Sequence, residues 1–504
     1  MKTRKVTLLT VALASMMLTV SCSDDFIEKT PTGSVIEEQY YKTESDAYAA
    51  LVAVYDLMRK ESGGYENMIA MLNAGSDDCY AGGGSPSDGA GLHGFDNFTI
   101  NSSTIPRSFW SDYYQGIFRA NLLLDKIAAI PMTETTKARF VAETKALRGY
   151  YYYQLVMMFK NIPLITAPVL PTEFYNILQA DRAAVWTQIE KDLTEAIAES
   201  NVPDVVNLET EAGRYSKGAM KAILGKVYLS QGKKSEAAAM FADVNGTPGG
   251  TSQYGYKLLS NYADLFDIYN KYNSESILES AHTQKSNSGW GNWGSSSDEG
   301  NTLNVMVGPR GYSAISADAP KFETGWSSNT ITESLQAALT GDPRYDTTIA
   351  DLKALVAAGK ASYTPADQDT GYFLKKFMPT HADITDGGGD VVLNYRQNTY
   401  VIRLADTYLL EAEALGGTGA RAQALLDAVR GRVNLPSVPV SLDAIANERR
   451  LELAGEGHRF RDLVRTGKAA STLPGFVAGK NEFFPIPLLE LSNTKIVQDP
   501  SYNQ

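Results

Sequence analysis

Cysteine and histidine are scarce in this chain of 504 residues, and their scarcity excludes several kinds of site. The 2 cysteines are Cys22 and Cys79. The 4 histidines are His93, His282, His381 and His458. Because the sequence has neither an H-E-x-x-H pattern nor a Cys pair with ligand spacing, a zinc site lacks support, and we expect no metal and no other cofactor.

A basic stripe and a second long apolar run are also missing. The formal net charge is -12, and Lys and Arg do not gather into the band that nucleic-acid binding requires. No segment after residue 22 is apolar over the roughly 20 residues that a membrane-spanning helix needs. Phosphate-binding glycine loops and G-x-S-x-G turns are absent as well, so no enzyme signature is found.

The first residues have the pattern of a secretory signal peptide. Lys2, Arg4 and Lys5 precede an uncharged, mostly apolar run over 6–20. The run ends in Leu-Thr-Val-Ser-Cys, which resembles a bacterial lipobox with Cys22 at the cleavage point. We therefore predict removal of residues 1–21, acylation of Cys22 (with palmitate or a similar fatty acid) and a lipidated tether over 22–33. With Cys22 acylated, Cys79 stays single and no intrachain disulfide forms.

The rest of the chain, 34–504, has the spacing of a mostly α-helical protein. Thr43-x-x-Asp46 resembles a capping box at the start of the first helix. Apolar periodicity and Pro or Gly stops predict helices over 43–60, 109–130, 135–159, 182–199, 214–231, 234–244, 330–340, 348–359, 397–416, 420–433 and 441–466.

One pair of these helices matches the tetratricopeptide pattern. Leu224-Gly225-x-x-Tyr228 is followed by Ala237-x-x-x-Phe241. Gly225 lets the second helix approach closely, while Ala237 and Phe241 form a small and large pair on that helix. Leu-x-x-x-Tyr recurs at residues 147–151 and 404–408, but not at one period. We expect several helix pairs embedded in a larger helical body rather than a simple solenoid.

Three irregular regions interrupt the helices, over 73–106, 284–328 and 362–396. They are rich in Gly, Ser, Asn and Asp, and long irregular segments in a helical protein are usually functional loops. Trp290 and Trp293 flank Asn292 in a Gly/Ser/Asn segment with no helix to bury them. Two readings stay open for these tryptophans: a stacking platform for a sugar ring, or a small hydrophobic cluster that closes a loop.

Blocks along nearly the whole chain resemble the SusD/RagB family of outer-membrane lipoproteins from glycan-uptake systems. The blocks are Trp110–Asn121, Ala146–Leu155, Tyr400–Asp406, Glu448–Leu453, Glu456–Arg465 and Phe484–Pro487. The resemblance implies a SusD-like fold and a lipid-anchored protein at the cell surface that binds a nutrient, most often an oligosaccharide. It also implies a partner, a SusC-like TonB-dependent β-barrel on which the protein sits as a lid, and no enzymatic activity.

The resemblance also implies a ligand groove lined by the loops over about 73–106 and 284–328. An Asp after a Ser in the first loop is a family element, and Ser76-Asp77-Asp78 is similar to it. The candidate ligand-binding residues are Asp77, Asp78, Tyr80, Phe95, Trp290, Asn292, Trp293, Tyr312 and Trp326. Unlike starch-binding members, the chain has no Trp between residues 80 and 105.

Three other functions compete with glycan binding. The same kind of lid could bind peptides, the helix pairs could form a protein–protein adaptor, or distant loops could bring two carboxyl groups together in a surface glycosidase. Against the last, the acidic residues of 448–465 alternate with arginines within a helical turn. Such pairing lowers a carboxyl pKa and is typical of a scaffold.

Overall fold

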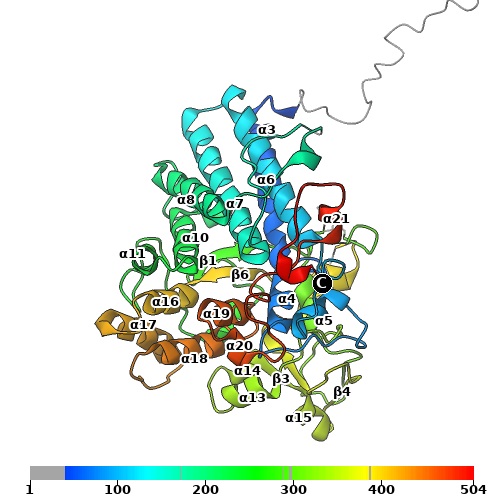
Figure 1. Ribbon diagram of the computed structural model, residues 1–504. Coiled ribbons are helices and arrows are strands. Elements are labelled where there is room, and N and C mark those ends of the chain that lie inside the picture. The colour runs from blue at the N-terminus through cyan, green and yellow to red at the C-terminus, as the bar shows by residue number, and fades with distance from the viewer. Residues whose placement is uncertain (1–39, 171, 286–287, 294–297, 385–386, 504) are drawn as a thin grey trace, which may run out of the picture.

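The computed structural model describes residues 40–170, 172–285, 288–293, 298–384 and 387–503 (Figure 1). Within them the protein is mostly α-helical, as predicted. The predicted signal segment, Cys22 and the tether lie outside the described residues. Among the described helices, none combines the length and apolar character that crossing a bilayer needs.

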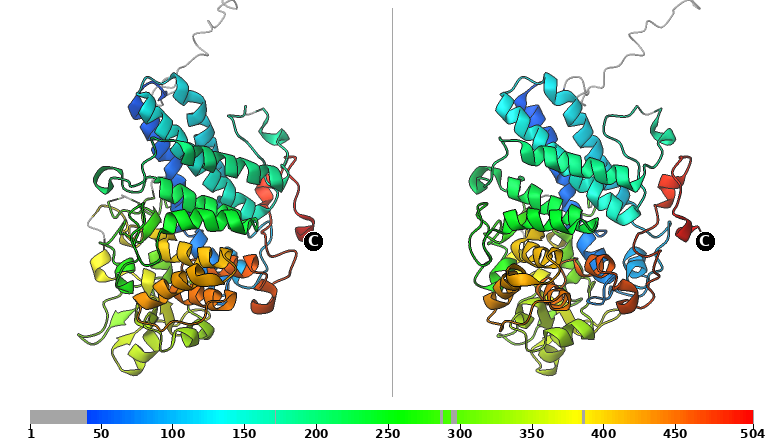
Figure 2. Two further views of the ribbon diagram at one scale, coloured as in Figure 1. Left: turned by 90° about the vertical axis from the view of Figure 1, so that its left-hand side faces the viewer. Right: turned by 60° about the vertical axis from the view of Figure 1, so that its left-hand side comes forward.

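One layer of the molecule is a stack of helices, which in Figure 2 runs from the blue and cyan helices near the top to the orange helices above the yellow-green segments. Each helix packs on the next in the stack. Their bounds are α3 (Glu44–Tyr55), α6 (Ser108–Lys126), α7 (Glu134–Phe159), α8 (Arg182–Ala198), α10 (Lys217–Ser230), α11 (Lys234–Asn245), α16 (Leu404–Ala414) and α17 (Gly419–Arg432).

Local sequence signals explain where these helices begin and how closely they pack. The Thr43 hydroxyl accepts from the Asp46 backbone, and the Asp46 carboxylate accepts from the Thr43 backbone, which confirms the capping box. A Cβ atom on Gly225 of α10 would lie 2.6 Å from the Phe241 ring of α11. The close approach of the tetratricopeptide-like pair is therefore confirmed.

The other layer holds short helices and three two-stranded antiparallel sheets. The sheets pair β1 (Ser276–Ser280) with β6 (Thr399–Arg403), β2 (Ser313–Ala314) with β4 (Ala361–Ser362), and β3 (Ile349–Asp351) with β5 (Tyr372–Leu374). The short helices of the described chain, of which α9 packs on α7 and α18 packs on α16 and α17 of the stack, are α4 (Met68–Ala74), α5 (Ala90–Asp96), α9 (Leu208–Glu211), α12 (Thr302–Val307), α13 (Glu333–Leu339), α14 (Tyr345–Thr348), α15 (Leu352–Ala357), α18 (Leu442–Glu452), α19 (Arg459–Arg465), α20 (Ala469–Thr472) and α21 (Leu488–Leu491). The 3₁₀ turns are η2 (Asp56–Glu61), η3 (Ile127–Ala129), η4 (Phe174–Asn176), η5 (Tyr262–Phe266), η6 (Lys375–Phe377), η7 (His381–Asp383), η8 (Val391–Leu393) and η9 (Pro500–Tyr502).

Three predicted helices differ from the structure. The range 397–416 begins with strand β6, and 348–359 begins with strand β3, because both segments pair with strands that are distant in sequence. The range 441–466 is two helices, α18 and α19. Gly455 and Gly457 between them have φ of 77° and 78°, a left-handed conformation that no continuous α-helix contains.

Candidate functional site

Three tryptophans from two loop segments meet in one aromatic cluster. The ring centroids of Trp290 and Trp293 are 5.4 Å apart, those of Trp293 and Trp326 5.6 Å, and those of Trp290 and Trp326 6.2 Å. Trp290 is 56% exposed, whereas Trp293 and Trp326 are half-buried behind it. We call Trp290, Trp293, Trp326 and the adjacent Tyr65 the aromatic platform, because their rings meet and Trp290 presents its ring to solvent.

Hydrogen bonds from the backbone and from one indole N–H position the rings of the platform. The Trp326 backbone N–H donates to Val305 O at 2.9 Å, which ties this loop to α12. The Trp290 backbone N–H donates to Asp390 Oδ2 at 3.2 Å. The indole Nε1–H of Trp293 points to Thr302 Oγ1 at 3.4 Å. The platform is therefore held by two separate segments, helix α12 and the segment that contains Asp390.

Polar groups that the sequence analysis missed border the platform. Tyr65 packs 6.0 Å from Trp326 and 6.3 Å from Trp293. Arg310 Nη2 binds Asp88 Oδ2 at 3.0 Å, and both side chains remain more than one-third exposed. Burial, followed by the negative charge of Asp88, raises the pKa of Tyr65 to about 12, so its hydroxyl stays protonated and able to donate. Gly63-Gly64 before Tyr65 and Gly82-Gly83-Gly84 before Asp88 were the available sequence signals.

The predicted residues of the first loop hold the scaffold together and do not join the platform. Asp78 is 2% exposed, and Arg450 Nε donates to it at 2.7 Å. Arg459 binds both carboxylate oxygens of Asp77 at 2.7 and 2.9 Å. Phe95 is 1% exposed and stacks on core aromatic rings, which corrects its assignment to the groove. The assignment of Asp78 to the groove is corrected for the same reason, since its side chain is buried and bound to Arg450.

The other predicted residues lie in three different places. The Tyr80 hydroxyl is 3.4 Å from Glu333 Oε2, apart from the tryptophans. Asn292 lies between the tryptophans but turns its Oδ1 to the backbone N–H of Gly289 at 2.7 Å, shaping the loop. Tyr312 packs on Phe322 with ring centroids 5.5 Å apart and forms a separate aromatic pair. Of the predicted residues, the structure thus joins only Trp290, Trp293 and Trp326 in one cluster, with Asn292 shaping their loop.

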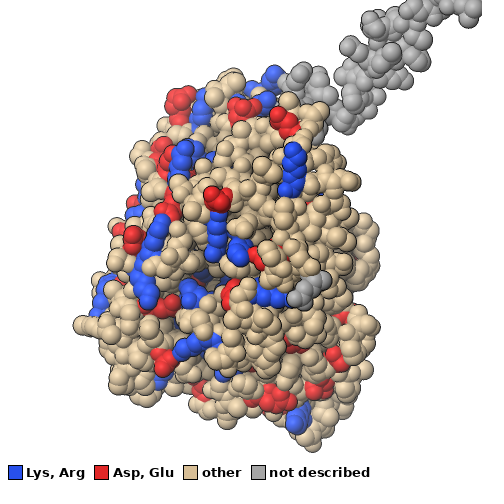
Figure 3. Space-filling view, in the orientation of Figure 1, with Lys and Arg blue, Asp and Glu red and all other residues tan. Residues whose placement is uncertain are grey.

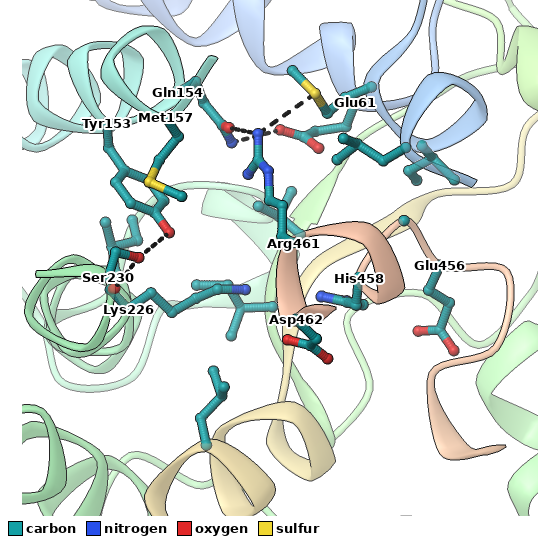
Figure 4. Close-up of a pocket in the computed structure, with 18 of the residues that line it drawn as sticks. Glu61, Tyr153, Gln154, Met157, Lys226, Ser230, Glu456, His458, Arg461 and Asp462 are labelled. Atoms are coloured by element: carbon teal, nitrogen blue, oxygen red, sulfur yellow. Dashed lines mark hydrogen bonds between the residues drawn. The ribbon is translucent and has the colours of Figure 1, made fainter. Parts of the chain in front are cut away.

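A second concave region lies between α7, α10 and α19 (Figure 4). Its polar side chains bind one another. Arg461 Nη2 donates to Gln154 Oε1 at 2.7 Å, the Tyr153 and Ser230 hydroxyls are 3.1 Å apart, and Lys226 binds a carboxylate of α16 at 3.0 Å. We therefore assign these groups to the packing of the helices. On the face drawn in Figure 3, Lys and Arg are interspersed with Asp and Glu.

The acidic residues of 448–465 belong to a buried ion-pair network, but the cations that bind the glutamates come from outside this segment. Arg403 contacts Glu275 at 3.0 Å, Glu452 at 2.6 Å and Glu456 at 2.8 Å. Arg344 adds a 3.0 Å contact to Glu452. Despite the opposing effect of burial, Arg432, Arg403 and Arg344 hold the pKa of Glu452 well below its usual range. Arg403 and Lys376 likewise lower the pKa of Glu456 to about 2. Neither carboxyl can act as a protonated catalytic acid at neutral pH.

Comparison with known proteins decides the family. Residues 222–484 match the SusD family, and residues 85–229 match a second family described as starch-binding and associating with the outer membrane. The chain belongs to the SusD family. The predicted resemblance and the predicted SusD-like fold are thereby confirmed.

Other SusD-like proteins match over almost the whole chain. A solved structure of a laminarin-binding SusD-like protein is 65% identical and superimposes with a TM-score of 0.90, covering 92% of this chain and 100% of that one. Surface glycan-binding protein A from Bacteroides fluxus is 26% identical, with a TM-score of 0.80 over 92% and 100% of the two chains. SusD-like protein P25 from Formosa agariphila is 26% identical over 89% of this chain and 87% of its own.

Proposed function

We propose that this SusD-family protein binds a glycan on the aromatic platform and that the glycan is a β-1,3-glucan of the laminarin type. The observation that supports this proposal is the exposed ring of Trp290, which packs on Trp293 and Trp326. A pyranose ring has an apolar face of C–H groups, and an indole face matches it. The laminarin-binding relative, at 65% identity, supports this ligand class.

The shape of the platform favours a curved glycan. The Trp290 and Trp326 rings are inclined by 31°, whereas Trp293 stands at 79° and 75° to them. Rings at such different angles do not form the flat strip that an extended β-1,4-linked chain would cover. A β-1,3-linked chain turns at each linkage and can follow an angled surface. Tyr65, Asp88 and Arg310 at the border then meet the sugar hydroxyls.

The position in the cell follows from the family and from the N-terminal sequence. Acylation of Cys22 would anchor the protein in the outer membrane, and the described part of the chain would then project from the cell surface. In this position the protein would be the lid of a SusC-like TonB-dependent import barrel. Recovery of such a barrel with the protein from detergent-solubilised membranes, and a diacylglycerol-modified Cys22 by mass spectrometry, test these two steps.

Binding without cleavage is the activity that the site supports. Glycoside hydrolysis needs one protonated and one ionised carboxyl on either side of the bond. At the platform, Asp88 is bound by Arg310, and Asp390 accepts from the Trp290 backbone at its edge. Purified protein incubated with laminarin should therefore release no reducing ends.

Calorimetric titration tests the ligand directly. We expect saturable binding of laminarihexaose and much weaker binding of cellohexaose, which has the same sugar in a β-1,4 linkage. Equal affinity for both would contradict the selection of a curved chain. Absence of binding to either hexasaccharide, together with retention of peptides from a library, would replace the glycan with a peptide ligand.

A further inference from the structure

The ion pair of Asp88 and Arg310 lies directly against one edge of the aromatic platform. Arg310 Nε donates to Trp326 O at 3.1 Å, which fixes the guanidinium beside this tryptophan. Gly89, the neighbour of Asp88, passes so close to Tyr65 that a Cβ atom there would overlap the Tyr65 hydroxyl oxygen. The pair therefore borders two of the four rings, and a sugar on this edge of the platform comes within its reach.

The loops that carry the pair are fixed before any ligand arrives. The Arg310 backbone N–H donates to Ser327 Oγ at 2.9 Å, and the Gly83 N–H donates to Ser327 O at 2.9 Å. The Gly84 N–H donates to Asp88 Oδ2 at 2.7 Å. Ser327 itself is fully buried and has a φ of 58°, a left-handed conformation that residues other than glycine rarely adopt. Such strained backbone persists where the surrounding structure fixes it, and it is common at ligand-binding sites.

The pair keeps one donor and one acceptor free for a ligand. Arg310 Nη2 binds Asp88 Oδ2 at 3.0 Å, and the two side chains are 37% and 39% exposed. Within the described chain, Arg310 Nη1 and Asp88 Oδ1 form no hydrogen bond, and both atoms are accessible to solvent. A lone anion would be repelled by Asp88 and a lone cation by Arg310. Two neighbouring hydroxyl groups satisfy both side chains, because a hydroxyl can donate and accept.

The units of a β-1,3-glucan differ in whether they offer such neighbouring hydroxyls. In an inner unit O3 is part of the linkage, so O2 and O4 have no free hydroxyl next to them on the ring. The unit at the non-reducing end keeps O2, O3 and O4 free, and so does a single glucose on a β-1,6 branch. An inner unit can offer only O4 together with O6, and O6 is carried on a rotatable CH₂ group whose ordering costs free energy.

We propose that the Asp88–Arg310 pair selects a terminal glucose, at the non-reducing end of the glucan or on a branch, by binding two adjacent ring hydroxyls. One hydroxyl accepts from the guanidinium, and the other donates to the carboxylate. The inference rests on the proposed glucan-binding function and names the part of the glucan that the site takes. The terminal unit lies at the edge formed by Trp326 and Tyr65, and the units that follow it pass over Trp290.

Calorimetric titration with two synthetic hexasaccharides tests this selection in the full mature chain. The first is the methyl β-glycoside of laminarihexaose, whose only adjacent free ring hydroxyls are on the non-reducing unit. The second has the O3 of that unit methylated, which gives the unit the free hydroxyls of an inner one. For the unaltered protein we expect methylation to raise Kd by about tenfold or more, because hydrogen bonds to charged groups are among the strongest.

An Arg310→Gln variant shows whether the ion pair is responsible. Its Kd for the first glycoside should rise by about the same factor, and methylation should then change Kd by less than about twofold. Lys145→Gln is the control, because Lys145 binds Glu195 at 2.8 Å in another partly exposed ion pair, which joins α7 to α8. It should behave as the unaltered protein does. An equal effect of methylation in Arg310→Gln and in the unaltered protein would overturn the role of the pair.

The number of proteins bound per chain gives a measurement that needs no variant. A linear β-1,3-glucan several times longer than the hexasaccharide adds inner units but no second non-reducing end, so we expect one protein per chain. Several proteins per chain, or equal affinity of the unaltered protein for the two glycosides, would overturn the selection of a terminal unit while binding on the platform stands. If the unaltered protein binds neither glycoside nor the longer glucan, the proposed function fails and this inference fails with it.

Discussion

Substitution of Trp290 by alanine should weaken glucan binding strongly without unfolding the protein. A tryptophan side chain can bury up to about 250 Å², so the 56% exposure of Trp290 corresponds to about 140 Å². A sugar that covers half of this area removes about 70 Å² from water. At about 25 cal/mol per Å², that contact contributes about 1.8 kcal/mol, or about a 20-fold change in Kd.

The assay is calorimetric titration of laminarihexaose into three proteins, the unaltered chain, Trp290→Ala and Tyr175→Ala. Tyr175 is a matched control, because it is 61% exposed and lies in η4, between α7 and α8. We expect Kd to rise about 20-fold for Trp290→Ala and to stay within twofold for Tyr175→Ala. The midpoint of thermal unfolding should move little in either variant, since both rings are mostly exposed.

A change in Kd below threefold for Trp290→Ala, with an unchanged midpoint, would refute the stacking role of this ring. It would favour the alternative hypothesis, in which the tryptophans form a small hydrophobic cluster that closes the loop and do not bind a sugar. Equal losses in Trp290→Ala and Tyr175→Ala would show that exposed aromatic rings bind the glucan without a defined site.

The remaining predictions concern stability and reactivity. Arg403→Met should lower the free energy of unfolding in urea by about 3–5 kcal/mol, because it leaves Glu452 and its neighbours buried without this cation; a loss below 1 kcal/mol would contradict the network. Burial lowers the pKa of His282 to about 4, so the unfolded chain binds an extra proton below pH 6.5 and the folded protein should lose about 3 kcal/mol of stability from pH 6.5 to 4. His282→Gln should flatten this part of the profile, and an unchanged slope would assign it to other groups. The buried Cys79, whose thiol pKa burial raises, should react with a thiol reagent only after denaturation, and rapid labelling of the folded protein would contradict its burial.

The sequence predicted helices well where they depend on contacts between residues that are close in the chain. The capping box at Thr43 and the close approach at Gly225 depend on contacts within a helix or between consecutive helices. The sequence predicts a helix where strand β6 lies, because the strand forms only by pairing with β1, which is more than 100 residues earlier. Periodicity in a short apolar segment does not reveal such a partner.

The charged residues show the same limit. Their assignment to ion pairs was correct, but the expected partners within one helical turn were wrong for Glu448, Glu452 and Glu456. Glu452 shows this most clearly. Its arginines, Arg344, Arg403 and Arg432, come from three other parts of the chain. Spacing along the sequence indicates that a carboxylate needs a cation, and only the fold determines which cation supplies it.

For the candidate site, the composition of the sequence identified the loop that carries Trp290 and Trp293 but not the polar residues that border the platform. Tryptophan in a Gly/Ser/Asn segment has no local element to cover it, so Trp290 and Trp293 were visible as candidates. Tyr65, Asp88 and Arg310 come from segments that only tertiary contacts bring to the platform. The two aspartates chosen by family resemblance, Asp77 and Asp78, face the arginines of α18 and α19 instead.

Those two aspartates connect the scaffold to recognition. By binding Arg450 and Arg459, they fasten the start of the first loop to the C-terminal helices. The same loop pairs with the segment after Trp326, since the Tyr80 N–H donates to Thr330 O and the Gly83 N–H to Ser327 O, both at 2.9 Å. Rings that are fixed before the ligand arrives lose little conformational freedom on binding, so a modest stacking area still yields useful affinity. The scaffold charges can therefore stay constant while the loop side chains change, and a change of sugar requires new rings on the same platform rather than a new fold.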